Sequence, residues 1–119
     1  MKIIKENISG WGRFPVSRAK IITPKNIEQL KKLISNEKVI ARGNGRSYGD
    51  SAINEKNTIC MKNFNKFLSF DNDTGLIVVE SGVMLSEIID SLLSKGWFPL
   101  VTPGSKYVTV GGMVACNVH

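Results

Sequence analysis

Two glycine-rich segments constrain the fold of this chain more than any other feature of its sequence. The first, Ala41–Ser51, reads ARGNGRSYGDS, and the second, Thr102–Gly112, reads TPGSKYVTVGG. Each follows a short apolar stretch, Lys38–Ala41 in one case and Trp97–Val101 in the other. Glycine permits backbone conformations and close approaches that other residues disfavour. We therefore expect two loops, each at the end of a strand, whose backbone can come close to a ligand.

Apolar spacing predicts an amphipathic helix after Ile21 and Ile22. Thr23 is suited to cap this helix, and Pro24 to occupy its first position. The apolar residues that would share one face of the helix are Ile27, Leu30, Leu33 and Ile34. Lys38–Ala41 and Thr58–Met61 are then typical of short strands.

A hairpin and a second helix are predicted further along the chain. Phe67–Phe70 and Leu76–Glu80 flank the sequence DNDTG, whose residues favour a tight turn. Apolar residues between Leu85 and Leu93 recur at helical spacing, and Gly96 marks the end of that helix. The chain shows no repeat and no shift in composition. We expect an α+β fold of mixed small sheets with flanking helices and without an internal boundary.

Composition sets broad limits on function. The 119 residues are 42% hydrophobic and 22% charged, with a net charge of +6, which indicates one globular unit. The lysines are scattered, a pattern more typical of a solvated surface than of a polyanion-binding face. Cys60 and Cys116 lie in no CxxC pair, so we expect no metal site. Without a signal sequence or an 18-residue apolar run, we expect a cytoplasmic protein, and peripheral membrane association stays open.

The first glycine-rich segment has the composition of a phosphate-binding loop. Successive N–H groups around glycines can face one anion, and Arg42, Arg46 and Ser47 add donors. Tyr48 would contact the ligand or shape the turn, and Asp50 would bond backbone amides. The spacing GxGxxxG differs from the dinucleotide fingerprint GxGxxG, and no P-loop lysine follows. By itself, the segment is therefore also compatible with a purely structural turn.

The second glycine-rich segment leads into a short predicted helix. Thr109 and the amides of Val110, Gly111 and Gly112 would bind a phosphate at its start, where the helix dipole favours an anion. Two such segments in one basic chain indicate a ligand with a diphosphate that is held from both sides.

The residues of both segments resemble the two FAD-binding segments of the vanillyl-alcohol-oxidase, or PCMH-type, flavoprotein family. The resemblance rests on ARGNGRSYGD at 41–50 and on PGS, VTVGG and ACNVH within 103–119. It extends to Trp11–Arg13, to Ile22–Pro24 and to Glu80–Val83, and it is strongest to the decaprenylphosphoryl-ribose oxidase and aldonolactone oxidase groups. It implies that residues 1–119 form the first part of an FAD-binding domain, which in the family continues and is followed by a substrate domain.

The resemblance also implies a set of cofactor contacts and a reaction class. The implied FAD-binding residues are Ala41, Arg42, Gly43, Asn44, Gly45, Arg46, Ser47, Tyr48, Gly49, Asp50, Ser51, Gly104, Ser105, Thr109, Val110, Gly111, Gly112, Cys116 and His119. The implied enzyme is an FAD-dependent oxidoreductase that oxidises an alcohol carbon of a sugar, aldonolactone or sugar-lipid. Its expected partners are FAD and a small-molecule alcohol or sugar substrate, and no nucleic acid. The alternative, which we rank second, is a non-enzymatic nucleotide- or nucleic-acid-binding module.

Single residues refine this interpretation. Many family members bond the flavin covalently to a histidine where this chain has Arg46, and a guanidinium offers no free lone pair for such a bond. We therefore expect non-covalent FAD. His119 would face the active site, although no complete catalytic set can be named. Cys116 is expected to be a small buried residue, and Trp11 and Trp97 to be packing residues.

Overall fold

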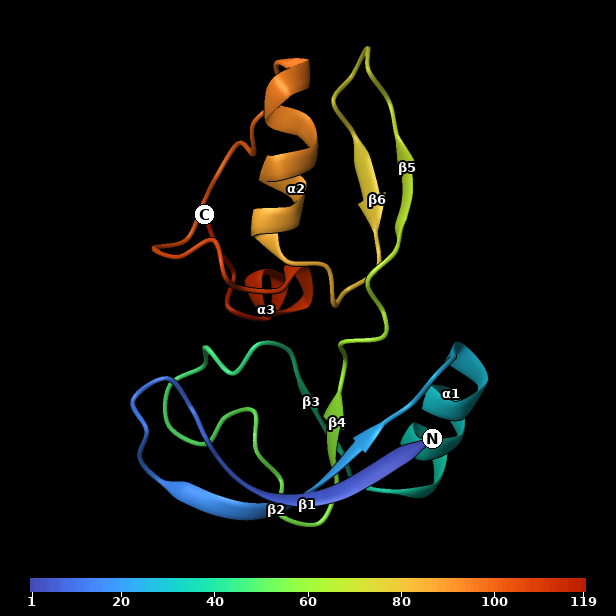
Figure 1. Cartoon of the computed structure of the whole chain (residues 1–119), viewed down its shortest axis with the longest axis vertical. Helices are drawn as coiled ribbons and strands as arrows, with labels where there is room; N and C mark the ends of the chain where they lie inside the picture. The colour runs from blue at the N-terminus through green and yellow to red at the C-terminus, as the bar shows by residue number, and fades with distance from the viewer. The chain divides into compact units, whose positions relative to one another are not determined.

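A computed structural model describes all residues, 1–119, and divides the chain into two compact units, Met1–Asn63 and Phe64–His119 (Figure 1). The sequence analysis saw no sign of this division. Composition is uniform along the chain, but each unit has its own apolar cluster, which composition alone does not reveal. None of the helices combines the length and the apolar character that a bilayer span requires.

The first unit is built on a four-stranded sheet with the order β1-β2-β4-β3. Its strands are β1 (Lys2–Ser9), β2 (Val16–Thr23), β3 (Ile40–Arg42) and β4 (Thr58–Cys60). β1 and β2 pair antiparallel along their full length, whereas β2, β4 and β3 run parallel. The sequence analysis identified β3 and β4 approximately and missed the β1–β2 pair.

The sheet of the first unit buries apolar side chains on both faces. Ile8, Ala19 and Ile21 form one cluster, against which Ile53 and Cys60 pack. Ile22 and Ile59, which alternate with these residues along β2 and β4, are each only 2% exposed. Burial on both faces is typical of parallel strands and accounts for their short, β-branched sequences.

Helix α1 (Ile27–Asn36) begins three residues later than predicted. Its cap is Asn26, whose side chain accepts a hydrogen bond from the Gln29 amide at 3.0 Å, so the assignment of Thr23 as cap was wrong. Thr23 is instead the last residue of β2, because the β-branched residues before it pair with β4. Ile27 and Ile34 on the predicted apolar face are 45% and 57% exposed, so this face is only partly covered.

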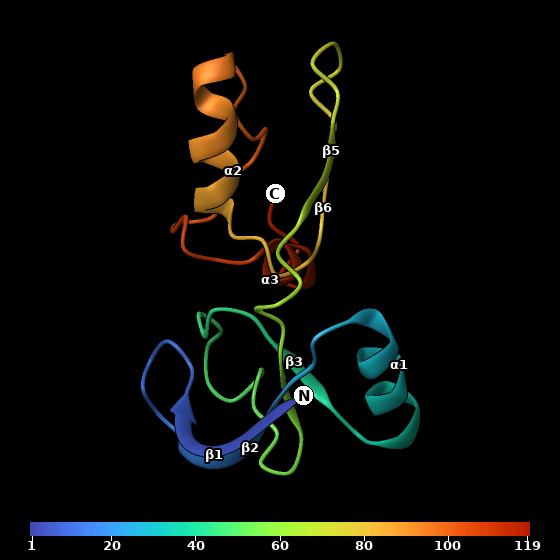
Figure 2. The same ribbon diagram turned by 45° about the vertical axis from the view of Figure 1, so that its right-hand side comes forward.

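The second unit consists of a hairpin, two α-helices and their connections. The hairpin strands are β5 (Phe67–Phe70) and β6 (Ile77–Val79), and they run alongside α2 (Leu85–Leu92) in both views (Figure 2). A 3₁₀ turn, η1 (Leu93–Lys95), extends α2, and Gly96 ends it with φ +84°. The predicted hairpin and second helix are confirmed.

The core of the second unit lies between α2 and the hairpin. Val83, Ile88 and Leu92 are buried there, and Phe70 and Trp97 pack against them. The two rings meet edge to face with centroids 6.2 Å apart, which confirms Trp97 as a packing residue. Beyond Trp97, however, the predicted strand does not form, since Pro99 cannot donate to a ladder and Leu100 is fully exposed.

The last helix is α3 (Val110–Ala115), which follows the second glycine-rich segment. That segment is fixed to the start of α2, because the amides of Leu85 and Ser86 donate to the carbonyls of Val108 and Lys106, both at 2.9 Å. The second loop is thus an integral part of the second unit.

Candidate functional site

The first unit contains a groove at the carboxyl ends of its parallel strands. It has a volume of about 580 Å³. Its lining residues come from β1, from the ends of β2, β3 and β4, and from the first glycine-rich loop, and they are Lys2, Ile4, Glu6, Ile8, Ile21, Thr23, Lys25, Arg42, Gly43, Asn44, Gly45, Cys60, Lys62 and Asn63. In open sheets with parallel strands, ligands bind at this edge.

The groove is strongly cationic. Lys2, Lys25, Arg42 and Lys62 line it, and Glu6 is the only carboxylate among the lining residues. The lysines are far apart in sequence, which is why the sequence analysis treated them as scattered surface charges. The fold gathers three of them around one cavity, so this part of the charge is a local field that favours an anion.

The first loop has the backbone conformation that its glycines indicated. Gly45 and Gly49 have φ values of +67° and +55°, in the left-handed region that favours glycine. A Cβ at Gly45 would come 2.8 Å from Nη2 of Arg42. The groove is therefore lined mainly by backbone along residues 43–45, where only Asn44 adds a side chain.

The remainder of the first loop is held by hydrogen bonds to its own backbone carbonyls. The Ser51 hydroxyl donates to the Tyr48 carbonyl at 2.9 Å, and the Ile53 amide donates to the Asp50 carbonyl at 3.0 Å. Asp50 thus shapes the turn through its carbonyl, whereas the sequence analysis expected its side chain to bond backbone amides. Tyr48 is 81% exposed, so its ring is accessible on the loop surface.

Both arginines of the loop contact the turn that joins β1 and β2. Nη2 of Arg42 donates to the Ser9 carbonyl at 2.8 Å, and the guanidinium carbon of Arg46 lies 4.4 Å from the centroid of the Trp11 ring. Trp11 is 56% exposed, so its ring packs on the surface and not in the core. Its ring instead forms a cation–π contact, which the sequence analysis missed because 35 residues separate the partners.

The second loop uses its amides within the second unit. The Val110 amide donates to the Val83 carbonyl at 2.8 Å, and the Gly111 amide donates to the Ser81 carbonyl at 2.9 Å. Thr109 caps α3 by accepting from the Gly112 amide at 3.2 Å. These three N–H groups already have acceptors, which corrects the expectation that they would face a phosphate.

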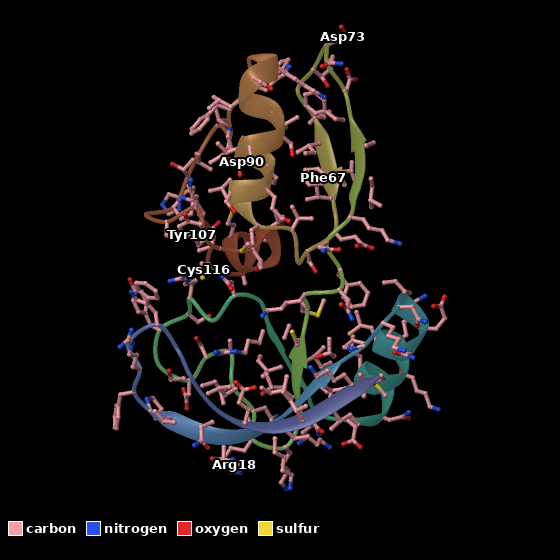
Figure 3. All side chains as sticks on the ribbon, in the orientation of Figure 1. Arg18, Phe67, Asp73, Asp90, Tyr107 and Cys116 are labelled. Atoms are coloured by element: carbon pink, nitrogen blue, oxygen red, sulfur yellow. The ribbon has the colours of Figure 1, made fainter.

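The glycines of this second loop have separate roles. A Cβ at Gly111 would come 3.2 Å from both the Cβ and the carbonyl oxygen of Ser81, so close packing favours glycine there. Gly104 is exposed, and a Cβ there would meet open space. Ser105 accepts from the Tyr107 amide at 3.1 Å, on the segment that leads to α3 (Figure 3).

The end of the described chain is exposed. Cys116, which caps the six-residue α3, is exposed rather than buried as expected, because no other segment of this unit covers it (Figure 3). His119 is also exposed, and its Nδ1 lies 2.7 Å from the Asn117 carbonyl oxygen. The structure thus places residues 41–51 in the first unit and residues 104–119 in the second.

These features fit a cofactor with a diphosphate. The groove combines four cations, glycine backbone that allows close approach, and the edge of parallel strands where nucleotide cofactors bind. A doubly charged, extended group would be held there by charge and by backbone contacts. The fold and the groove together therefore define a cofactor-binding domain.

Comparison with known proteins identifies the family. Residues 19–119 match the family described as FAD binding domain, and the chain belongs to that family. The cofactor is FAD. The match spans both units and both glycine-rich loops, and it confirms the family resemblance that the loop sequences indicated.

Named relatives include two oxidases. The chain is 34% identical over 121 residues to decaprenylphosphoryl-beta-D-ribose oxidase of Mycolicibacterium smegmatis, an alignment that covers 96% of this chain and 26% of the relative. It is 28% identical over 104 residues to a putative D-arabinono-1,4-lactone oxidase of Neurospora crassa, with 82% and 18% covered. The chain therefore spans about a quarter or less of the length of these relatives.

Solved structures support the fold. Cholesterol oxidase from B. sterolicum superposes with a TM-score of 0.80 at 15% identity, over 99% of this chain and 24% of that protein. Alkyldihydroxyacetonephosphate synthase gives a TM-score of 0.67 at 23% identity, over 84% and 20%. At these identities, the superpositions show a shared fold.

Proposed function

We propose that this chain is the FAD-binding part of a flavin-dependent oxidoreductase that oxidises an alcohol carbon of a sugar, aldonolactone or sugar-lipid. The single observation that carries the cofactor role is the cationic groove at the carboxyl ends of β2, β4 and β3, within a chain of the FAD-binding family. The two oxidase relatives named for a ribose derivative and a lactone support the substrate class.

The residues of the first loop would hold the diphosphate of FAD. Gly43 and Gly45 would allow the phosphates to approach the backbone, and Lys2, Lys25 and Lys62 would neutralise part of their charge. When bound, FAD supplies the hydride acceptor for alcohol oxidation. The protein would bind and orient the cofactor.

The second loop would contact FAD through groups other than the three bonded amides. Gly104 and Ser105 lie on its accessible part, and the exposed Cys116 and His119 follow α3. Thr109 to Gly112 would then act chiefly by shaping the loop, since their polar groups bond within the second unit.

The proposal is tested on the full-length protein. The purified protein should be yellow, and anaerobic addition of a sugar or aldonolactone substrate should bleach the flavin absorbance. Apoprotein prepared by removing the flavin should regain the spectrum with added FAD. A full-length protein that neither contains nor takes up FAD would contradict the proposal. If sugars and lactones leave the flavin oxidised while another alcohol reduces it, only the proposed substrate class is overturned.

A further inference from the structure

The turn between β1 and β2 contacts the first glycine-rich loop at three points. The Trp11 amide donates to the Ser47 carbonyl at 2.8 Å, and the Ser9 carbonyl accepts from Arg42 at 2.8 Å. The third contact is the Trp11 ring against the guanidinium of Arg46, at 4.4 Å. We call residues Ser9–Trp11 the anchoring turn. It precedes residue 19, where the family match begins.

Gly10 shows how closely the anchoring turn and the loop approach each other. It is buried, and a Cβ at this position would come 2.4 Å from the Gly49 carbonyl oxygen and 2.5 Å from the Ser47 carbonyl oxygen. Both atoms belong to backbone, so no side-chain movement would relieve the clash. Any larger residue at position 10 must displace the loop or the turn.

The contact with Ser47 fixes the direction of a loop amide. A trans peptide unit is planar, with its C=O and N–H on opposite sides. The Ser47 carbonyl points at the anchoring turn, so the Tyr48 N–H of the same peptide points away from it. The loop contains two glycines with positive φ, and without such contacts it would sample many conformations.

We infer that the anchoring turn holds the first loop in its cofactor-binding conformation, and that Gly10 and Trp11 are positioning residues for FAD. This inference rests on the proposed cofactor role of the loop. It predicts that affinity for FAD depends on residues outside the matched family region, because preorganisation of a binding loop reduces the entropy lost on binding.

The test uses full-length protein with the flavin removed. Gly10→Ala should displace the loop, and Trp11→Leu should remove the cation–π contact while keeping an apolar side chain. Trp11→Phe, which keeps an aromatic face, should recover part of the effect. Phe14→Ala is the matched control, since Phe14 lies in the same connection and is 82% exposed. Far-UV circular dichroism checks that each variant is folded.

Two readouts separate loop order from cofactor affinity. Hydrogen exchange of the apoprotein should accelerate in the peptide that covers residues 43–51 for Gly10→Ala and Trp11→Leu, and stay unchanged for Phe14→Ala. FAD titration should show affinity weakened about three- to tenfold by Trp11→Leu, the range that a cation–π contact supports, and more by Gly10→Ala. Unchanged exchange in both anchoring-turn variants would overturn the inference.

The outcomes also distinguish this inference from the proposed function. If Gly45→Val weakens FAD binding while Gly10→Ala and Trp11→Leu bind normally, the loop binds FAD but the anchoring turn does not position it, and only the inference fails. If exchange accelerates in both anchoring-turn variants and neither they nor Gly45→Val change FAD affinity, the cofactor role of the loop is wrong, and the inference fails with it.

Discussion

Gly75 packs directly against the indole ring of Trp97, so that a Cβ at position 75 would come 2.5 Å from Cζ3 of that ring. The contact joins the turn between β5 and β6 to the segment that follows α2. Gly75 also has φ +74°, and its amide donates to the Asp71 carbonyl at 2.8 Å. Both the backbone conformation and the packing therefore require glycine.

Replacement of Gly75 by alanine should consequently destabilise the protein by about 2–3 kcal/mol, from a left-handed backbone combined with overpacking. Gly96→Ala is the matched control, because Gly96 has φ +84° but a Cβ there would meet open space. Its cost should be only about 1 kcal/mol. Urea unfolding of the two variants measures the difference, and equal losses would show that the Trp97 contact is unimportant.

Replacement of Gly45 by valine should weaken FAD binding in the full-length protein by about a hundredfold. A β-branched residue at φ +67° is strained, and its Cβ would displace the Arg42 guanidinium, which lies at the edge of the groove, from the Ser9 carbonyl. A combined cost of roughly 3 kcal/mol corresponds to about a hundredfold in affinity. Gly12→Val is the control, since a Cβ there has no neighbour within 4 Å. A Gly45→Val protein that contains a full complement of FAD would falsify the placement of the diphosphate at this loop.

The flavin should be released when the holoprotein is denatured with acid. Arg46 contacts the Trp11 ring through its guanidinium, which has no free lone pair for a bond to the flavin. After acid precipitation, the yellow colour should remain in the supernatant. Colour retained in the pellet would indicate a covalent link, and peptide mapping would then show whether it involves this loop or another residue.

The turn between β5 and β6 should lose stability in acid. The Asp73 and Thr74 amides donate to Oδ1 of Asp71, at 2.8 and 3.3 Å, and hold the pKa of that carboxyl below its ordinary value. A depressed folded pKa contributes stability above the unfolded pKa, and this contribution is lost as pH falls through the folded value. Asp71→Asn keeps an acceptor oxygen without the charge.

The stability of Asp71→Asn should accordingly change less with pH than that of the parent protein between neutral pH and the folded pKa of Asp71. Urea midpoints measured across this range test the difference. A direct check is the chemical shift of the Asp71 carboxyl during an acid titration. A midpoint at or above the ordinary aspartate value would contradict the proposed role of the two amide bonds.

Local signals accounted for the parts of the fold that the sequence predicted correctly. The DNDTG turn and the apolar period of α2 act over a few residues, so the β5–β6 hairpin and α2 were predictable. Strand β1 was missed because its sequence, KIIKENIS, has no regular alternation of apolar and polar residues and acquires its partner only through β2. The cap of α1 was misplaced because Thr23 had two possible uses, and pairing with β4 decided between them.

The residues of the candidate site were likewise predictable only where the signal was local. Glycine spacing located the first loop, since positive φ at Gly45 and Gly49 is a property of the loop itself. Lys2, Lys25 and Lys62 gave no signal because only the sheet topology brings them to one groove. The bonded amides of Val110 and Gly111 depend on contacts with residues near position 82, which no local pattern shows.

Strand β1 also protects the protein from self-association. It lies at the edge of its sheet, and Lys2, Lys5 and Glu6 place charges along that edge, which discourages the addition of a strand from another molecule. A shortened chain that began at residue 19 would remove this cover. The edge then presented to solvent would belong to β2, with its apolar Ile21 and Ile22, and such a chain would be prone to aggregation through strand pairing.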